Sequence, residues 1–255
     1  MLLEVDMGNT YIKWRLVDGL VVRASGRNLT AEDCFDWFAP LNAGNELREV
    51  LVSSVAQSVR LQALQQVVQS VNPGLSLRVA QVVAEWSGVR FVYQDVTKLG
   101  VDRALAMVAA YRRCPQGAMV IDAGSAITAD LVNADGRHLG GYIMPGLPLL
   151  AKALATGTAQ LPLVQEAEVS LDPGDSTASC IASGVMLMAV AALDSLCAVA
   201  RARGINNILV AGGDGAVLAR YCRGRVTGCP DLVFEGLECV FGYPPVQEMT
   251  IKKRE

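Results

Sequence analysis

The chain has few ionisable side chains and a single histidine, and both shortages limit its chemistry. Charged residues make up 18% of the 255 residues, and His138 is the only histidine. One histidine excludes a His-rich zinc site, and no nucleophile-elbow sequence offers a serine to complete a triad with it. A basic field is also missing, because the net charge is −3. Nucleic acid is therefore not expected as a main partner.

Metal-binding cysteine patterns and export signals are also missing. The seven cysteines include no Cys-x-x-Cys pair, and their odd number without a signal sequence favours reduced thiols. Met1 leads directly into a segment that carries Glu4 and Asp6, without a basic and apolar leader. The apolar stretch at residues 178–193 is interrupted by serines and a glycine and ends before Asp194, so no membrane span is expected. A globular, cytoplasmic protein is expected.

Nucleotide-binding motifs of the Walker and Rossmann types do not occur, but two stretches of the chain resemble each other. Residues 5–19 and 121–136 each contain an apolar strand ending in Asp, a Gly with small polar residues, a second strand and an Asp-Gly turn. The two Asp-x-Gly units lie 116 residues apart (122 − 6), so each opens one half of the chain. Two such hairpins can grip a polyphosphate from opposite sides.

The order of the expected elements indicates two packed lobes built on one plan. In each half, three antiparallel strands lead into alternating strands and helices, which indicates a mixed sheet covered by helices. We place residues 1–115 in an N-terminal lobe and residues 116–255 in a C-terminal lobe. Helices are expected at residues 31–41, 57–71, 102–114, 146–156, 177–203 and 233–241, whereas residues 82–99 are expected to be irregular.

The first hairpin carries groups suited to a triphosphate. Gly8 allows close approach of the backbone and a positive φ, and Asn9-Thr10 supply hydrogen-bond donors. Lys13 can meet a terminal phosphate, and Asp6 can hold Mg²⁺ directly or through water. A plain hairpin could use the same residues. The second copy of the pattern favours phosphate binding over that alternative.

Two other segments carry candidate functional groups. Gly100-Val101-Asp102-Arg103 places a carboxylate and a guanidinium together at a helix start. Asp102 could accept a proton from an acceptor hydroxyl, and Arg103 could bind a carboxylate or phosphate. An N-capped helix with a surface ion pair is the alternative interpretation. The glycine-rich run at residues 212–215 could seat an adenosine group, and a strand-to-helix turn explains it equally well.

In combination these motifs resemble those of the type III pantothenate kinases. Asp6-x-Gly8-Asn9-Thr10, Gly100-x-Asp102-Arg103, Asp122-x-Gly124-Ser125 and the glycine-containing segment 140–146 occur in the family's order, and residues 230–237 also resemble the family. The match spans residues 2 to about 242. The family belongs to the actin-like ATPase and sugar-kinase superfamily. The resemblance therefore implies an α/β fold of two duplicated ribonuclease-H-like lobes.

The resemblance also implies an activity, namely ATP-dependent phosphorylation of pantothenate in the first step of coenzyme A synthesis. It implies Asp102 as the general base, Mg²⁺ near Asp6, and a monovalent cation, K⁺ or NH₄⁺, at Asp122. A homodimer is implied, in which the partner subunit helps to build the pantothenate pocket. The implied ATP ligands are Asp6, Met7, Gly8, Asn9, Thr10, Tyr11, Ile12, Lys13 and Ser125, and the implied pantothenate ligands are Tyr93, Gly100, Val101, Asp102, Arg103 and Thr177.

Two positions depart from the family pattern, and two other functions stay open. Ser125 stands where the family usually has Thr, and the stretch around Thr177 matches more loosely. One alternative is a related small-molecule kinase of the same superfamily, against which Gly100-x-Asp102-Arg103 argues. The other is a catalytically weak regulatory or accessory protein, a role described for family members in transcription. The presence of Asp6, Asp102 and Asp122 favours an active enzyme.

Overall fold

The computed structural model describes residues 1–32, 34–44, 46–56, 58–164 and 170–246. Packing divides them into two compact units. Unit 1 comprises residues 1–88, residues 93–109 and the described residues from Leu232 onward. Unit 2 comprises residues 89–92 and 110–231. The C-terminal helix α7 (Leu232–Phe241) therefore belongs to unit 1, whereas the expected boundary after residue 115 puts it in the C-terminal lobe.

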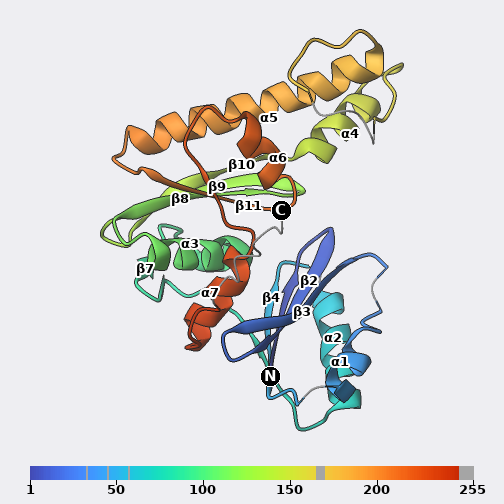
Figure 1. The fold of residues 1–255 in the computed structure, drawn as a ribbon, viewed down its shortest axis with the longest axis vertical. Coiled ribbons are helices and arrows are strands. Elements are labelled where there is room, and N and C mark those ends of the chain that lie inside the picture. The colour runs from blue at the N-terminus through green and yellow to red at the C-terminus, as the bar shows by residue number, and fades with distance from the viewer. Residues whose placement is uncertain (33, 45, 57, 165–169, 247–255) are drawn as a thin grey trace, which may run out of the picture. The chain divides into compact units, whose positions relative to one another are not determined.

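Unit 1 is built on a mixed five-stranded sheet of order β3-β2-β1-β4-β5 (Figure 1). The strands are β1 (Leu2–Met7), β2 (Tyr11–Asp18), β3 (Val21–Leu29), β4 (Glu49–Ser54) and β5 (Ser76–Val79). The central strand β1 is antiparallel to β2 and parallel to β4. Every residue of β1 is buried, as expected for a strand whose two faces are both covered by helices.

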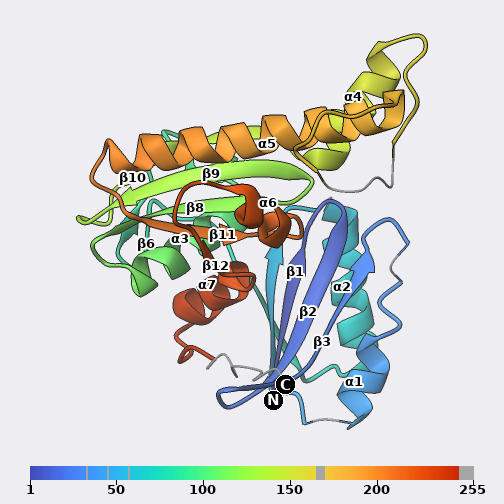
Figure 2. The ribbon, with the colours of Figure 1, turned by 45° about the horizontal axis from the view of Figure 1, so that its top comes forward.

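Each face of this sheet has its own helical cover. Leu3, Val5 and Met7 point to a core shared with α1 (Phe38–Gly44) and α2 (Ser58–Val71). Figure 2 shows α2 running alongside the strands. Helices α3 (Val101–Arg113) and α7 (Leu232–Phe241) cover the opposite face through the core residues Leu2, Leu51, Val101, Leu105, Val233, Phe234 and Leu237.

Unit 2 repeats the same sheet plan with the order β10-β9-β8-β11-β12. Its strands are β8 (Gly117–Ala123), β9 (Ala126–Asn133), β10 (His138–Pro145), β11 (Asn207–Ala211) and β12 (Thr227–Gly228). The pairing directions match those of unit 1, because β8 is antiparallel to β9 and parallel to β11. The expected duplication of a mixed sheet covered by helices is confirmed.

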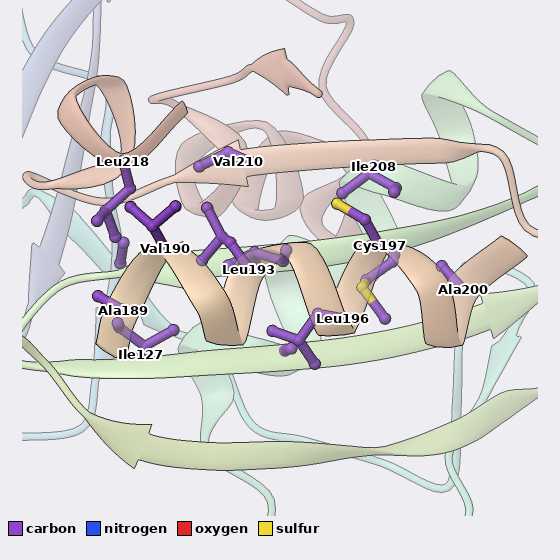
Figure 3. Packing of buried hydrophobic residues seen from close by; sticks show 14 of the residues in the cluster. Ile127, Ala189, Val190, Leu193, Leu196, Cys197, Ala200, Ile208, Val210 and Leu218 are labelled. Atoms are coloured by element: carbon purple, nitrogen blue, oxygen red, sulfur yellow. The ribbon is translucent and has the colours of Figure 1, made fainter. Parts of the chain in front are cut away.

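The long helix α5 (Thr177–Arg201) supplies most of the core of unit 2. Figure 3 shows Leu193 and Cys197 on the side of α5 that faces Val210 and Ile208 of β11. In the described part of the chain, α5 is the one helix long and apolar enough to cross a membrane. Its buried side chains recur along one stripe that faces the sheet, which is the pattern of a core helix in a globular protein. Helix α4 (Leu147–Gly157) packs on its N-terminal half.

One expected helix is wrong, and several short elements were not expected. A helix is expected at residues 31–41, but α1 begins only at Phe38. Phe35 has φ 60°, which interrupts a helix, and Pro40 fits the first turn of a helix that starts two residues earlier. The unexpected elements are the strand pair β6 (Glu85–Trp86) and β7 (Val89–Arg90), the 3₁₀ turn η1 (Val96–Lys98) and β12. Helix α6 (Gly215–Tyr221) follows the run at residues 212–215, where a strand-to-helix turn is one of the two sequence interpretations.

Candidate functional site

Three polar residues lie side by side near the end of β1 in unit 1. Asp6 is 9% exposed and lies opposite Lys13 of β2 and Ser53 of β4 in the register of the sheet. Residues directly opposite in neighbouring strands project from the same face, so these three residues lie side by side on one face of the sheet. Ser53 is fully buried, and its Oγ has no hydrogen-bond partner among the described residues. The arrangement offers oxygen donors and one balancing positive charge.

Sequence reasoning missed Ser53, although a signal for it exists. The residue lies near the end of an apolar strand, at the same level as Asp6. In parallel strands the carboxyl ends share one edge of the sheet, so a polar residue at the end of each strand is brought into one row. Only the pairing of β4 beside β1, which the sequence does not specify, identifies which serine belongs to that row.

The turn between β1 and β2 is closed tightly. The Gly8 N–H donates to the Tyr11 carbonyl at 3.0 Å, and the Gly8 carbonyl accepts from Thr30 Oγ1 at 2.9 Å. The expected positive φ at Gly8 is wrong, since its φ lies outside the left-handed region. A Cβ there would instead lie 2.9 Å from the Tyr11 carbonyl oxygen, so close packing restricts the position. Asn9 and Thr10 are exposed at the tip.

A second polar group in unit 1 lies around the start of α3. Asp102 occupies the first helical turn, and its Oδ1 accepts from the Arg103 N–H at 2.8 Å. Arg103 Nη1 donates to the Tyr93 hydroxyl at 3.1 Å, and its guanidinium carbon lies 5.9 Å from the centre of the Tyr93 ring. The structure thus brings Tyr93, Asp102 and Arg103 together. Gly100 adjoins them, and its carbonyl accepts from the Ala104 N–H at 3.0 Å.

The second Asp-x-Gly hairpin has the same form but different neighbours. Asp122 of β8 lies opposite Thr128 of β9 and Ala211 of β11. These two residues replace the lysine and the serine that stand opposite Asp6 in unit 1. No ammonium group therefore stands opposite Asp122, and the side chain opposite it on β9 carries the hydroxyl of Thr128. Ser125 is exposed, and its carbonyl accepts from the Gly146 N–H at 3.1 Å.

The glycine-rich run after β11 forms a strand-to-helix turn. Gly212 has φ +87°, and a Cβ on it would lie 2.3 Å from the Ala123 carbonyl oxygen. The Asp214 N–H donates to the same carbonyl at 3.0 Å. Burial raises the pKa of the Asp214 carboxyl above its ordinary value. The turn is thus packed against the end of β8, next to Asp122.

Thr177 belongs to unit 2, unlike the other residues that were expected to bind pantothenate. It is the exposed first residue of α5, after the capping residue Ser176. It lines a mainly apolar cavity of about 1110 Å³ between α4 and α5 in unit 2. Tyr93, Asp102 and Arg103 belong to unit 1.

Solved structures with this architecture include kinases. A ROK family glucokinase from Streptomyces griseus, in complex with glucose and AMPPNP, matches with a TM-score of 0.52 at 14% identity, covering 95% of this chain and 98% of that one. A Campylobacter jejuni protein described as a candidate Baf family transcriptional activator matches with a TM-score of 0.58 at 21% identity, covering 94% and 97%. The duplicated sheets place the protein in the fold class that actin-like ATPases and sugar kinases share.

Sequence comparison identifies the family within that class. The family model for type III pantothenate kinase matches residues 2–199. A type III pantothenate kinase from Ectopseudomonas mendocina is 34% identical over 261 residues, covering 93% of this chain and 97% of the relative. One from Chromohalobacter salexigens is 35% identical over 250 residues, covering 94% and 87%. The chain belongs to the type III pantothenate kinase family.

Proposed function

We propose that the protein phosphorylates pantothenate with ATP to give 4'-phosphopantothenate, the first step of coenzyme A biosynthesis. The observation that carries the proposal is the cluster of Asp102, Arg103 and Tyr93 in a member of this family. The Asp102 carboxylate can accept a proton from the hydroxyl of a hydroxy acid, and the Arg103 guanidinium can bind the carboxylate of the same molecule. Family membership makes pantothenate the hydroxy acid to expect.

Asp102 serves as the general base in this proposal. Its Oδ1 already accepts the Arg103 N–H, which fixes the carboxylate at the start of α3. From there it accepts the proton of the primary hydroxyl as the oxygen attacks the γ-phosphorus. Arg103 binds the pantothenate carboxylate, and the Tyr93 hydroxyl orients its guanidinium. Gly100, Val101 and Thr177 complete the proposed pantothenate ligands.

Residues 6–13 and Ser125 bind ATP in this proposal. Asp6 fits a Mg²⁺ ion, because the buried Ser53 hydroxyl beside it adds a second hard oxygen donor. Mg²⁺ bound there supplies positive charge to the phosphate oxygens. Lys13, opposite Asp6, contributes a further positive charge toward the terminal phosphate. These groups stabilise charge that develops on the transferred phosphoryl group.

Asp122 fits a monovalent cation, K⁺ or NH₄⁺. Its cross-strand neighbour Thr128 adds a hydroxyl, and no ammonium occupies the position that Lys13 has in unit 1. Oxygen donors with a single carboxylate suit a singly charged ion better than they suit a phosphate. The two copies of the hairpin therefore have different roles in the proposal.

The proposed oligomer is a homodimer in the cytoplasm, joined through the α4–α5 region. Leu187 and Met188 on α5 are 57% and 60% exposed, and Leu154 on α4 is also exposed. They border the apolar cavity that Thr177 lines. Large exposed apolar side chains grouped in this way favour contact with another protein surface. A second copy seated there would bring its residues to Thr177.

A coupled assay tests the proposed activity directly. The purified protein is mixed with pantothenate, ATP and Mg²⁺, with and without K⁺, and ADP release is followed. We expect turnover that requires pantothenate and increases with K⁺. A panel of sugars and small hydroxy acids tests the related-kinase alternative, which faster turnover of another acceptor would favour. ADP release that does not respond to pantothenate would favour the regulatory alternative.

A further inference from the structure

A fourth residue extends the row of Ser53, Asp6 and Lys13 to the edge of the unit 1 sheet. Lys13 of β2 lies opposite Asp6 on one side and opposite Arg27 of the edge strand β3 on the other. The pairing of β2 with β3 is regular over residues 11–16, so this register is well defined. Because residues directly opposite each other project from the same face, Arg27 shares a face with Asp6 and Lys13.

The end of β3 is bonded to the turn that carries the first Asp-x-Gly motif. Thr30 directly follows β3, and its N–H donates to the Thr10 carbonyl at 2.9 Å. Its hydroxyl donates to the Gly8 carbonyl, also at 2.9 Å, and the residue is buried. Arg27 lies three residues before Thr30 in the sequence. The strand that carries Arg27 is therefore held against the turn that the proposed function assigns to the phosphates of ATP.

The side chain of Arg27 contacts the residue that follows this turn. Its guanidinium carbon lies 5.0 Å from the centre of the Tyr11 ring. Tyr11 is the first residue of β2 and directly follows Thr10. A cation above an aromatic face is attracted to it, so the contact restricts where the guanidinium can point. Arg27 is thus oriented next to the turn and remains exposed.

Lys13 and Arg27 bring two positive charges opposite each other. Within the described part of the chain, neither side chain forms an ion pair. Like charges directly opposite each other in neighbouring strands are destabilising. Elsewhere on β3 the arrangement differs, because Arg23 pairs with Asp18 at 2.8 Å. Two opposed cations beside the turn therefore favour an anion that binds both.

The chemistry of the guanidinium and the spacing of the strands indicate which anion fits. A guanidinium donates in a planar fork that matches phosphate oxygens. Two strand spacings of about 4.8 Å put Arg27 roughly 10 Å from Asp6, so the two residues serve different parts of one triphosphate. Stacking on Tyr11 alone is the alternative role, and it requires no opposed lysine. We propose that Arg27 binds phosphate oxygens of ATP together with Lys13, an inference that rests on the proposed function.

Calorimetric titration of the full-length protein with Mg²⁺ and the nonhydrolysable ATP analogue AMPPNP, without pantothenate, tests this role. The test variant is Arg27→Gln. The matched control is Arg23→Gln, which removes an exposed arginine of the same strand that pairs with Asp18. Arg27→Lys keeps the charge and loses the planar fork. Thermal unfolding of each protein without nucleotide shows whether the side chain supports the fold.

We expect Arg27→Gln to bind AMPPNP at least tenfold more weakly than the wild type, because a charge-assisted hydrogen bond is lost. Arg27→Lys should lie between the two, and Arg23→Gln should stay within about twofold of the wild type. The Tm of nucleotide-free Arg27→Gln should stay within about 2 °C of wild type, since relief of the repulsion from Lys13 offsets the lost contact with Tyr11.

Three results would overturn the role of Arg27. They are an affinity of Arg27→Gln within twofold of wild type, equal losses in Arg27→Gln and Arg23→Gln, and a loss of affinity accompanied by a clearly lower Tm. Each of them leaves the proposed function intact if the wild type binds AMPPNP. A wild-type protein that does not bind AMPPNP would overturn the proposed ATP site together with the role of Arg27.

Discussion

Arg15 on β2 and Glu238 on α7 form a buried ion pair with a distance of 2.5 Å, although 223 residues separate them in the sequence. Arg15 also pairs with Glu4 on β1, and its guanidinium carbon lies 4.8 Å from the centre of the Phe234 ring. The side chains of Arg15 and Glu238 are only 4% and 1% exposed. The cluster links α7 to β1 and β2, in agreement with the place of α7 in unit 1.

Replacement of Arg15 should destabilise the protein strongly. In Arg15→Met, the buried carboxylates of Glu4 and Glu238 lose their shared positive partner, and such losses cost about 3–5 kcal/mol. Glu238→Ala should cost less, because Arg15 keeps its pair with Glu4. Urea unfolding followed by circular dichroism measures both changes.

The control for this prediction is Arg23→Met on the neighbouring strand β3. Arg23 pairs with Asp18 at 2.8 Å, but the two side chains are 53% and 44% exposed. An exposed pair contributes about 0–1 kcal/mol, so the free energy of unfolding should hardly change. Equal losses for Arg15→Met and Arg23→Met would contradict the role assigned to the buried cluster.

The sequence predicts the local parts of this fold well and its long-range pairings poorly. The hairpins after Asp6 and Asp122 could be predicted because strand, glycine turn and strand follow one another directly. The row formed by Ser53 beside Asp6 depends on β4 lying next to β1, and nothing local encodes that order. The same holds for Glu238, whose partner is 223 residues away. Which charged residues pair in the core depends on how distant segments pack, and this packing cannot be read from a single sequence.

Asp102→Asn should abolish most turnover while nucleotide binding persists. The amide keeps the size of the side chain but cannot accept the proton of the hydroxyl, and general-base catalysis contributes about 10²- to 10⁴-fold. We expect kcat to fall by that factor, with the affinity for ATP, measured by calorimetry, within about twofold of wild type. Asp95→Asn is the matched control, because Asp95 only caps η1 through Thr97. A near-normal kcat in Asp102→Asn would contradict the assignment of Asp102 as the general base.

Gly146→Ala should weaken ATP binding through the second hairpin. A Cβ at residue 146 would lie 2.2 Å from the Gly124 carbonyl oxygen and 2.6 Å from that of Ser125, so the turn must shift. The backbone of Gly146 has φ −74°, which alanine adopts without strain, so only the close approach is tested. We expect a raised KM for ATP. Gly157→Ala, at the other end of α4, meets nothing within 4 Å and should leave KM unchanged.

Cys222 should resist alkylation at neutral pH although its side chain is only partly buried. Burial, with hydrogen bonding to Asp194 Oδ1 at 3.3 Å, raises the pKa of the Cys222 thiol to about 12. At pH 8 a thiol with that pKa is ionised to about one part in 10⁴, and the thiolate is the reactive form. Iodoacetamide labelling followed by peptide mass spectrometry should therefore modify the exposed Cys34 and Cys180 well before Cys222.

The same shift in pKa sets the sign of a pH effect on stability. The folded protein holds the Cys222 proton more tightly than the unfolded chain, whose thiol has an ordinary pKa of 9.0. Between pH 9.0 and about 12 the unfolded state therefore binds fewer protons, and the free energy of unfolding falls as pH rises. Cys222→Ala removes this titration, so its stability should decline less steeply across that window than that of the wild type. Parallel slopes for the two proteins, together with fast labelling of Cys222 at pH 8, would show that the thiol is not held protonated by its surroundings.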